Sequence, residues 1–313
     1  MLQVNGIHHV TAIAGDAQEN VNFYAGLLGL RLVKRTVNFD DPQSYHLYYG
    51  DGAGNPGTLL TFFAWPGAQR GRVGLGQVTG TALAIGPNSL LYWQERLQAH
   101  GISGEIETRF GETMLAFADP DGIRIELVPT PSDPRSGWPE GHIPAEHAIK
   151  GIHGVTLPER SSADTAALLT EVLGFREAAT DGTVTRYSSG TEPSTSADVV
   201  FAPNTVPGQI AVGNIHHVAW RTSDDAEQAS WLRELSALGY GVSPVMDRDY
   251  FHSIYFREPG GILFEIATDP PGFAIDESPD TLGHMLQLPA QYESRRAQIE
   301  ANLPPLRVPK VDR

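Results

Sequence analysis

The chain has 313 residues, which is enough for two domains with separate hydrophobic cores. Its 22 basic and 37 acidic residues give a formal net charge of −15. This balance argues against nucleic acid or an anionic membrane as a partner, because both attract clustered positive charge. The absence of cysteine excludes disulfides, thiolate metal ligands and thiol nucleophiles. No apolar run reaches the roughly 20 residues of a membrane span, and no signal-peptide pattern is found, so the expected location is the cytoplasm.

One β-α-β-β-β pattern occurs four times along the chain. Each copy begins with a short apolar strand, continues into a helix that ends near a glycine, and closes with further strands. The predicted copies span residues 6–66, 78–130, 151–203 and 213–270. A single unit leaves a sheet edge and a sheet face uncovered, so the units should pair. The predicted fold class is therefore α+β, with four modules forming two barrels.

The copies divide the sequence into a first domain at 6–130 and a second domain at 151–270. The segment 131–150 is rich in proline, glycine and charged residues and is typical of a linker. The repeat stops near residue 270, and 271–313 form a predicted C-terminal helical arm. Within this arm, residues 291–302 have the pattern of a charged helix with a solvated face.

Histidine pairs open the first and fourth copies, as His8-His9 and His216-His217. In the last strand of the fourth copy, Glu265 is a lone carboxylate among apolar neighbours. A buried carboxylate without a partner is costly, which favours a metal at this position. Two imidazoles and one carboxylate form the facial triad that holds non-haem Fe(II), with Mn(II) or Zn(II) as alternatives. The second histidine of each pair and Glu265 are the predicted metal ligands: His9, His217 and Glu265.

The other copies lack a complete set of ligands. At the slot of the metal-binding histidine, the second copy is predicted to carry Thr81 and the third Gly154. At the slot of the carboxylate, Glu126 stands in the second copy, and apolar residues around Phe62 and Val200 stand in the first and third. Glu126 is therefore predicted to be paired by hydrogen bonds without a metal. His153, one residue out of the ligand register, is also predicted to be structural.

A three-ligand site requires the first and fourth copies to share one barrel, which leaves the second and third copies to form the other. The alternative pairs copies within each half of the sequence and yields two incomplete sites, which is less plausible. Side chains alternate across a strand, so an inward-facing His9 turns Thr11 inward as well. The same alternation places His8 and His216 behind or beside the metal.

These motifs make the chain resemble the vicinal oxygen chelate superfamily of glyoxalases, bleomycin-resistance proteins and dioxygenases. The resemblance rests on the four modules, the His-His-Val openings and the Gly-Gly-Ile-Leu-Phe-Glu strand. More narrowly, the chain looks like bacterial dioxygenases that open hydroquinones between ring carbons 1 and 2. The segments that carry this narrower resemblance are 45–49, 71–72, 109–111, 247–251 and 291–293.

The resemblance implies an Fe(II)-dependent dioxygenase that inserts O2 into a hydroquinone-like or catechol-like ring and cleaves it. It implies that His9, His217 and Glu265 bind the iron. The further site residues that it implies are His8, Thr11, His216, Arg248 and Tyr255.

A mechanistic hypothesis gives roles to four of these residues. His8 or His216 would move the phenol proton, Arg248 would stabilise negative charge, and Tyr255 would donate a hydrogen bond to bound oxygen. The implied partners are a small aromatic substrate and O2, and a homo-oligomer is left open. Two alternatives remain: a glyoxalase-like metal-dependent lyase or isomerase, and a non-catalytic small-molecule-binding protein of the same fold.

Overall fold

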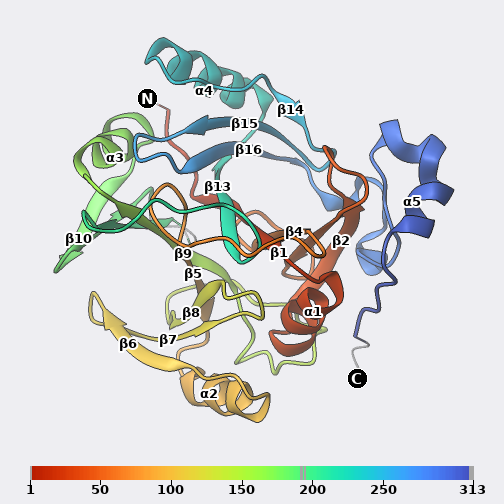
Figure 1. Ribbon diagram of the computed structural model, residues 1–313. Helices are drawn as coiled ribbons and strands as arrows, with labels where there is room; N and C mark the ends of the chain where they lie inside the picture. The colour runs from red at the N-terminus through yellow and green to blue at the C-terminus, as the bar shows by residue number, and fades with distance from the viewer. Residues whose placement is uncertain (1, 191–192, 194, 310–313) are drawn as a thin grey trace.

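The computed structural model describes residues 2–190, 193 and 195–309. Its core consists of two eight-stranded sheets, each curled into a half-barrel, with helices on the outside (Figure 1). Strands from the two ends of the chain share one sheet, and the middle of the chain builds the other. This confirms the predicted pairing of the first copy with the fourth and of the second copy with the third.

The first sheet joins the first and fourth copies through β1 and β13, which pair antiparallel at its centre. In spatial order its strands are β14 (Met246–Asp247), β15 (Phe251–Arg257), β16 (Leu263–Pro271), β13 (Asn214–Thr222), β1 (Ile7–Ala14), β4 (Leu59–Ala64), β3 (Tyr45–Gly50) and β2 (Arg31–Val37).

The second sheet has the same arrangement, with β9 and β5 antiparallel at its centre. In spatial order its strands are β10 (Arg176–Asp181), β11 (Val184–Ser188), β12 (Ser196–Phe201), β9 (Gly151–Glu159), β5 (Gly80–Ile85), β8 (Arg124–Pro129), β7 (Glu112–Ala118) and β6 (Glu105–Arg109).

One helical segment in each copy covers the outer face of a sheet, as the repeat predicts. The helices pack through large apolar side chains: Trp93 on the second sheet and Trp231 on the first are both fully buried. The segments are α1 (Ala17–Val21) with the π-helical turn η1 (Asn22–Leu27), α2 (Leu90–Ala99), α3 (Ala163–Ala167) with the π-helical turn η2 (Leu168–Val172), and α4 (Asp225–Ala237). None of the helices within the described residues has the length and apolar character needed to cross a membrane.

The C-terminal arm is helical, as predicted, but in short pieces that pack on the first copy. The hydroxyl group of Tyr292 donates a 2.6 Å hydrogen bond to the carbonyl of Phe39, just beyond β2. Tyr45 reaches the arm as well, donating to the carbonyl of Pro304 at 2.9 Å. The pieces are η3 (Phe273–Ile275), η4 (Pro279–Thr281), η5 (Ala290–Arg295) and α5 (Arg296–Asn302). The arm thereby holds the segment that follows β2.

The register of the strands shows which residues of the first sheet are equivalent. In the parallel pair of β13 and β16, Glu265 lies opposite the residue two places after His217. In the parallel pair of β1 and β4, Thr61 lies opposite the residue two places after His9. The predicted slot at Phe62 was therefore wrong by one residue, because Thr61 occupies in the first copy the place that Glu265 occupies in the fourth.

The same register identifies the equivalent slots in the second sheet. Glu126 lies opposite the residue two places after Gly80, and Asp198 lies opposite the residue two places after Gly154. The two histidine slots are therefore occupied by glycines and the two carboxylate slots by acids. The predicted slots at Thr81 and Val200 were wrong, because short apolar strands can be aligned in more than one register.

A buried pair of carboxylates lies where the two sheets meet. Glu159 at the end of β9 faces Glu258 in the turn before β16, and both are 2% exposed. Glu258 accepts hydrogen bonds from Thr165 and from the backbone of Ile262, whereas Oε1 of Glu159 has no partner. Burial, followed by the charge of Glu258, raises the pKa of Glu159 to about 8. Gly260 makes room for this carboxyl group, because a Cβ there would lie 1.8 Å from its Oε2.

The raised pKa predicts a pH-dependent stability that Glu159→Gln removes. Between the usual glutamate pKa and about 8, the folded protein holds a proton that the unfolded chain releases. The free energy of unfolding should therefore fall as pH rises through this window, by at most about 1.4 kcal/mol per pH unit. Glu159→Gln, which is uncharged, should flatten the decline. Denaturant unfolding at pH 6 and pH 9 measures it, with exposed Glu95→Gln as control; equal pH profiles for wild type and Glu159→Gln would contradict the assignment.

Candidate metal centre

The side chains of His9, His217 and Glu265 converge in the first barrel. The Nε2 atoms of the two histidines are 3.3 Å apart, and Oε2 of Glu265 lies 3.4 Å from His9 and 2.9 Å from His217. All three side chains are buried. Within the described part of the chain, they are the only group of three or more histidine or acidic side chains positioned to share one metal ion.

The donor atoms fit a divalent metal. The hydroxyl of Ser253 donates a hydrogen bond to Oε1 of Glu265, while Oε2 has no hydrogen-bond partner and faces the two imidazoles. Ligands at about 2.1 Å from one ion and at right angles to each other are about 3.0 Å apart. The three observed separations are of this size. A metal would therefore satisfy the buried oxygen that the protein leaves without a hydrogen bond.

The first histidine of each pair orients the second. Nδ1 of His8 lies 2.9 Å from Nδ1 of His9, and Nδ1 of His216 lies 2.8 Å from Nδ1 of His217. If Nε2 of a ligand histidine binds metal, its proton sits on Nδ1 and is donated to the preceding imidazole. That imidazole must be neutral to accept it. Burial, then the neighbouring histidine, lowers the pKa of His8 well below its usual value and that of His216 to about 3.

A small cavity lies against the imidazoles of His9 and His217 and has a volume of about 30 Å³. This volume holds one or two water molecules and is too small for an aromatic ring. An aromatic ligand therefore requires the wall to move outward. A larger cavity of about 630 Å³ lies on the surface near Trp138 and contains none of the three converging side chains. The small cavity is lined by His9, Thr11, Asn38, Phe39, Asp40, His46, Tyr48, Phe63, His217, Arg248, Phe251 and Tyr255.

Arg248 lines the cavity and lies between two of its aromatic rings. Its guanidinium lies 5.4 Å from the ring centre of Phe39, beyond β2, and 5.4 Å from that of Tyr255 on β15. Its Nε donates a 3.2 Å hydrogen bond to the hydroxyl oxygen of Tyr255. Burial, then the charge of Glu265, raises the pKa of Tyr255, so its phenol stays protonated and has a hydrogen to donate. A fixed cation and a phenolic donor therefore lie beside the triad.

Three of the five further residues implied by the resemblance line the cavity: Thr11, Arg248 and Tyr255. The other two, His8 and His216, do not; each contacts a ligand imidazole instead. Sequence reasoning missed His46 and Tyr48, which line the cavity from β3. The signal was their spacing, because residues two apart on a strand face the same side.

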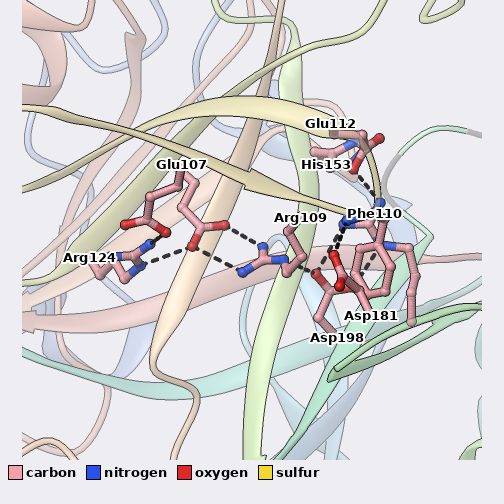
Figure 2. Close-up of polar contacts among 10 residues, drawn as sticks. Glu107, Arg109, Phe110, Glu112, Arg124, His153, Asp181 and Asp198 are labelled. Atoms are coloured by element: carbon pink, nitrogen blue, oxygen red, sulfur yellow. Dashed lines mark hydrogen bonds and ion pairs between the residues drawn. The ribbon is translucent and has the colours of Figure 1, made fainter. Parts of the chain in front are cut away.

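In the second barrel, a guanidinium lies between the two carboxylate slots (Figure 2). Arg109 is 2.6 Å from Glu126 and 3.0 Å from Asp198. Each carboxylate also has an outer partner: Arg124 lies 2.9 Å from Glu126, and Arg186 lies 2.7 Å from Asp198. Neither glycine slot has a side chain at the position where the first barrel has its histidines, and a Cβ at Gly154 would lie 2.9 Å from the backbone oxygen of Ser196. Arg109 thus supplies the positive charge that a metal would supply.

The network confirms that Glu126 is paired by hydrogen bonds, as the sequence predicted. His153 is also tied into it, because its Nε2 lies 3.6 Å from Glu112, which in turn contacts Arg186. Burial alone would raise the pKa of Glu112, but the nearby imidazole of His153 and the hydrogen bond from Arg186 lower it to about 2. His153 is therefore a partner of an acidic side chain, in agreement with its predicted structural role.

Comparison with known proteins extends over nearly the whole chain. "Putative ring-cleaving dioxygenase MhqO" of Bacillus subtilis (strain 168) is 47% identical over 307 residues, which cover 98% of each chain. "Chlorohydroquinone/hydroquinone 1,2-dioxygenase" of Sphingobium indicum is 33% identical over 306 residues, which cover 95% of each chain. A crystal structure from Bacillus subtilis subsp. subtilis str. 168 superposes with a TM-score of 0.96 at 46% identity, covering 99% of this chain and 100% of the other.

Residues 6–127 and 151–266 both match one family model, and these segments contain all four copies of the repeat except the last few residues of the second and fourth. The two matched segments make up well over half of the chain. The fold, the repeat and the full-length relatives agree with that match. The chain therefore belongs to the Glyoxalase/Bleomycin resistance protein/Dioxygenase superfamily.

Proposed function

We propose that the protein is a non-haem Fe(II) dioxygenase that cleaves a dihydroxylated aromatic ring. The observation that carries the proposal is the set of three buried ligands, His9, His217 and Glu265, beside a cavity with aromatic walls. Three protein ligands leave coordination positions for a substrate oxygen and for O2. The relative named for hydroquinone 1,2-dioxygenase activity supports a hydroquinone or a related diol as the substrate.

When bound, Fe(II) supplies the Lewis acid and the redox chemistry that allow O2 to react with the ring. The protein supplies the surroundings. The rings of Phe39, Phe63 and Phe251 form an apolar wall against which an aromatic substrate would stack. The Arg248 guanidinium stabilises a substrate that carries negative charge, and the Tyr255 hydroxyl donates a hydrogen bond to an oxygen atom nearby.

The fourth ligand slot argues against a glyoxalase-like lyase. In the first barrel, the slot equivalent to Glu265 is Thr61, whose neutral hydroxyl is bonded to Thr11 at 2.8 Å. A lyase of this fold is expected to use two histidine and carboxylate pairs, and here one carboxylate is replaced. The three-ligand arrangement favours the oxygenase.

Elemental analysis combined with O2 uptake tests the proposal. Protein purified without oxygen should contain about one iron per chain after reconstitution with Fe(II) and should consume O2 with a member of a hydroquinone and catechol panel. The product should have lost its aromatic absorbance. Stoichiometric zinc without O2 uptake would support a lyase instead, and protein that binds no metal would overturn both readings.

Replacing Arg248 should impair turnover while leaving metal binding intact. Because the guanidinium faces the cavity and makes no contact with the triad, Arg248→Ala should reduce kcat by about 100-fold or more at unchanged iron content. Arg248→Lys keeps a positive charge, so its kcat should fall less than that of Arg248→Ala. Arg257→Ala, an exposed arginine near the other end of the same hairpin, is the matched control. Equal kcat values for Arg248→Ala and wild type on the true substrate would remove Arg248 from the reaction.

A further inference from the structure

His46 is a buried histidine of the cavity wall to which the proposed mechanism gives no role. It lies on β3 and is 7% exposed. Both of its ring nitrogens are engaged by hydroxyl groups: Nε2 lies 3.1 Å from Oγ1 of Thr61, and Nδ1 lies 2.9 Å from the hydroxyl of Tyr48. An imidazole between two hydroxyl groups can pass a proton, because each nitrogen accepts in one tautomer and donates in the other.

The contacts of His46 are part of a longer chain of hydrogen bonds. Oγ1 of Thr61 also lies 2.8 Å from Oγ1 of Thr11, which gives the order Thr11, Thr61, His46, Tyr48. Thr11 and Tyr48 both line the cavity, so the chain begins and ends there. Thr61 is fully buried and is not among the residues that line the cavity. Thr61 therefore connects Thr11 to His46 from behind the cavity wall.

All members of this chain are uncharged at neutral pH. Burial, then the charges of His9 and His217, holds the pKa of His46 well below its usual value. Burial raises the pKa of Tyr48 well above its usual value. Neutral groups linked in this way have two arrangements of their hydrogen atoms. In one arrangement Tyr48 donates to His46, His46 donates to Thr61, and Thr61 donates to Thr11, whose own hydrogen then points into the cavity. In the other arrangement every hydrogen bond runs in the opposite direction.

We propose that His46 is a positioning residue of the ring-cleavage site, linking Thr11 to Tyr48 in a proton relay that deprotonates a substrate hydroxyl. The proposal rests on the proposed function, because it needs a phenolic substrate beside Thr11. It adds a route for the phenol proton that avoids the two histidines hydrogen-bonded to the metal ligands. The route begins at a hydroxyl group on the cavity wall and returns to the same cavity at Tyr48.

The proton balance of the relay is simple. The substrate hydroxyl gives its proton to Thr11 as Thr11 gives its own to Thr61, and Thr61 protonates Nε2 of His46. His46 releases the proton on Nδ1 to Tyr48, and the original hydroxyl proton of Tyr48 passes through a water molecule in the cavity to the carboxylate of Asp40, an exposed side chain that lines the same cavity and returns the proton to solvent. One proton leaves the substrate and one arrives on the carboxylate of Asp40, while the four side chains of the relay remain neutral. A second, reverse pass or rotation of the hydroxyl groups resets the chain.

Thr61→Val is the decisive variant, because it interrupts the relay without changing the cavity wall. Valine has nearly the shape of threonine but no hydroxyl, so kcat should fall by about 100-fold, the usual size of a general acid–base contribution. Thr61→Ser restores the hydroxyl and should recover most of the loss. Thr81→Val, a buried threonine on β5 of the second barrel, controls for the loss of a buried hydroxyl. Iron content and the anaerobic Kd of the substrate should stay within about threefold in all three variants.

Two further readouts separate a relay from a structural contact. The solvent deuterium isotope effect on kcat should change in Thr61→Val and return in Thr61→Ser, whereas a packing defect would leave it unaltered. The double variant Thr61→Val with His46→Gln should lose no more activity than the worse single variant, because both interrupt one chain. Three outcomes would each overturn the proposal. The first is a kcat of Thr61→Val within threefold of the wild-type value, and the second is additive losses of kcat in the double variant. The third is a Thr61→Val protein that loses iron together with activity.

A spectroscopic measurement distinguishes failure of the relay from failure of the proposed function. In protein with 15N-labelled histidine, the His46 signals, identified by their absence in His46→Gln, should be those of a neutral, hydrogen-bonded imidazole. They should shift in Thr61→Val and in Tyr48→Phe. If they do and wild-type protein consumes no O2 with any diol, the chain of hydrogen bonds stands and the dioxygenase assignment and its relay fall. If O2 is consumed and the signals do not shift, the relay alone is wrong.

Discussion

His217→Ala protein is expected to lose its iron and its ring-cleaving activity together. The imidazole of His217 would contribute one of the three proposed ligand atoms and lies 2.9 Å from the unsatisfied oxygen of Glu265. Loss of a residue that only orients a ligand typically costs 10–100-fold in metal affinity, so loss of a ligand should cost more than about 100-fold. Iron per chain by elemental analysis and O2 uptake on the same samples measure both losses.

The neighbouring histidine provides a graded comparison. His216→Ala removes the partner of Nδ1 and leaves the ligand in place, so iron affinity should fall by only about 10–100-fold. His100→Ala, an exposed histidine at the end of α2, should change neither quantity. Full iron occupancy in His217→Ala would disprove the ligand assignment. Loss of iron in His100→Ala as well would mean that the measurement reports general damage and not the site.

The pairing of the first copy with the fourth was predictable because a three-ligand metal site requires side chains from both copies. His9 and His217 lie in the first and last copies, and only a barrel that joins these copies brings them to one carboxylate. The structure has this pairing, through β1 and β13. The exact strand register was not predictable to the same degree. An apolar strand with little alternation fits its neighbour almost equally well one residue away, which is how Thr61 and Asp198 were missed.

The cavity wall could be predicted only in part, for a physical reason. His9 and Glu265 are recognisable because a ligand set has a chemical signature, whereas the identity of a wall residue depends on which strands face each other across the barrel. His46 and Phe39 reach the cavity because β2 and β3 curl toward β15, a consequence of sheet twist that no local pattern encodes. The contact of Tyr292 with Phe39 likewise joins residues far apart in the sequence.

Arg109→Met is expected to destabilise the protein by about 3 kcal/mol without affecting the metal centre. The substitution keeps much of the side-chain volume but removes the cation shared by Glu126 and Asp198, which are 1% and 4% exposed. Breaking a buried ion pair by removing one partner typically costs about 3–5 kcal/mol, because the remaining charge loses both water and its partner. We expect a loss at the lower end of this energy range, because Arg124 and Arg186 remain to pair with Glu126 and Asp198.

The cause of that loss can be isolated by removing the opposing charge. Arg109→Met combined with Glu126→Gln should recover part of the stability, since an amide is less costly than a carboxylate to bury without a partner. Arg124→Met, at a side chain that is 41% exposed, should cost less than Arg109→Met although it contacts the same carboxylate. Denaturant unfolding measures all three, and iron content should remain at the wild-type value. If Arg109→Met and Arg124→Met lower the free energy of unfolding equally, the guanidinium of Arg109 contributes no more than a partly exposed partner. If Arg109→Met lowers the free energy of unfolding much more than Arg124→Met, the second barrel is held together by an internal cation that lies between the carboxylate slots equivalent to those of the proposed metal site in the first.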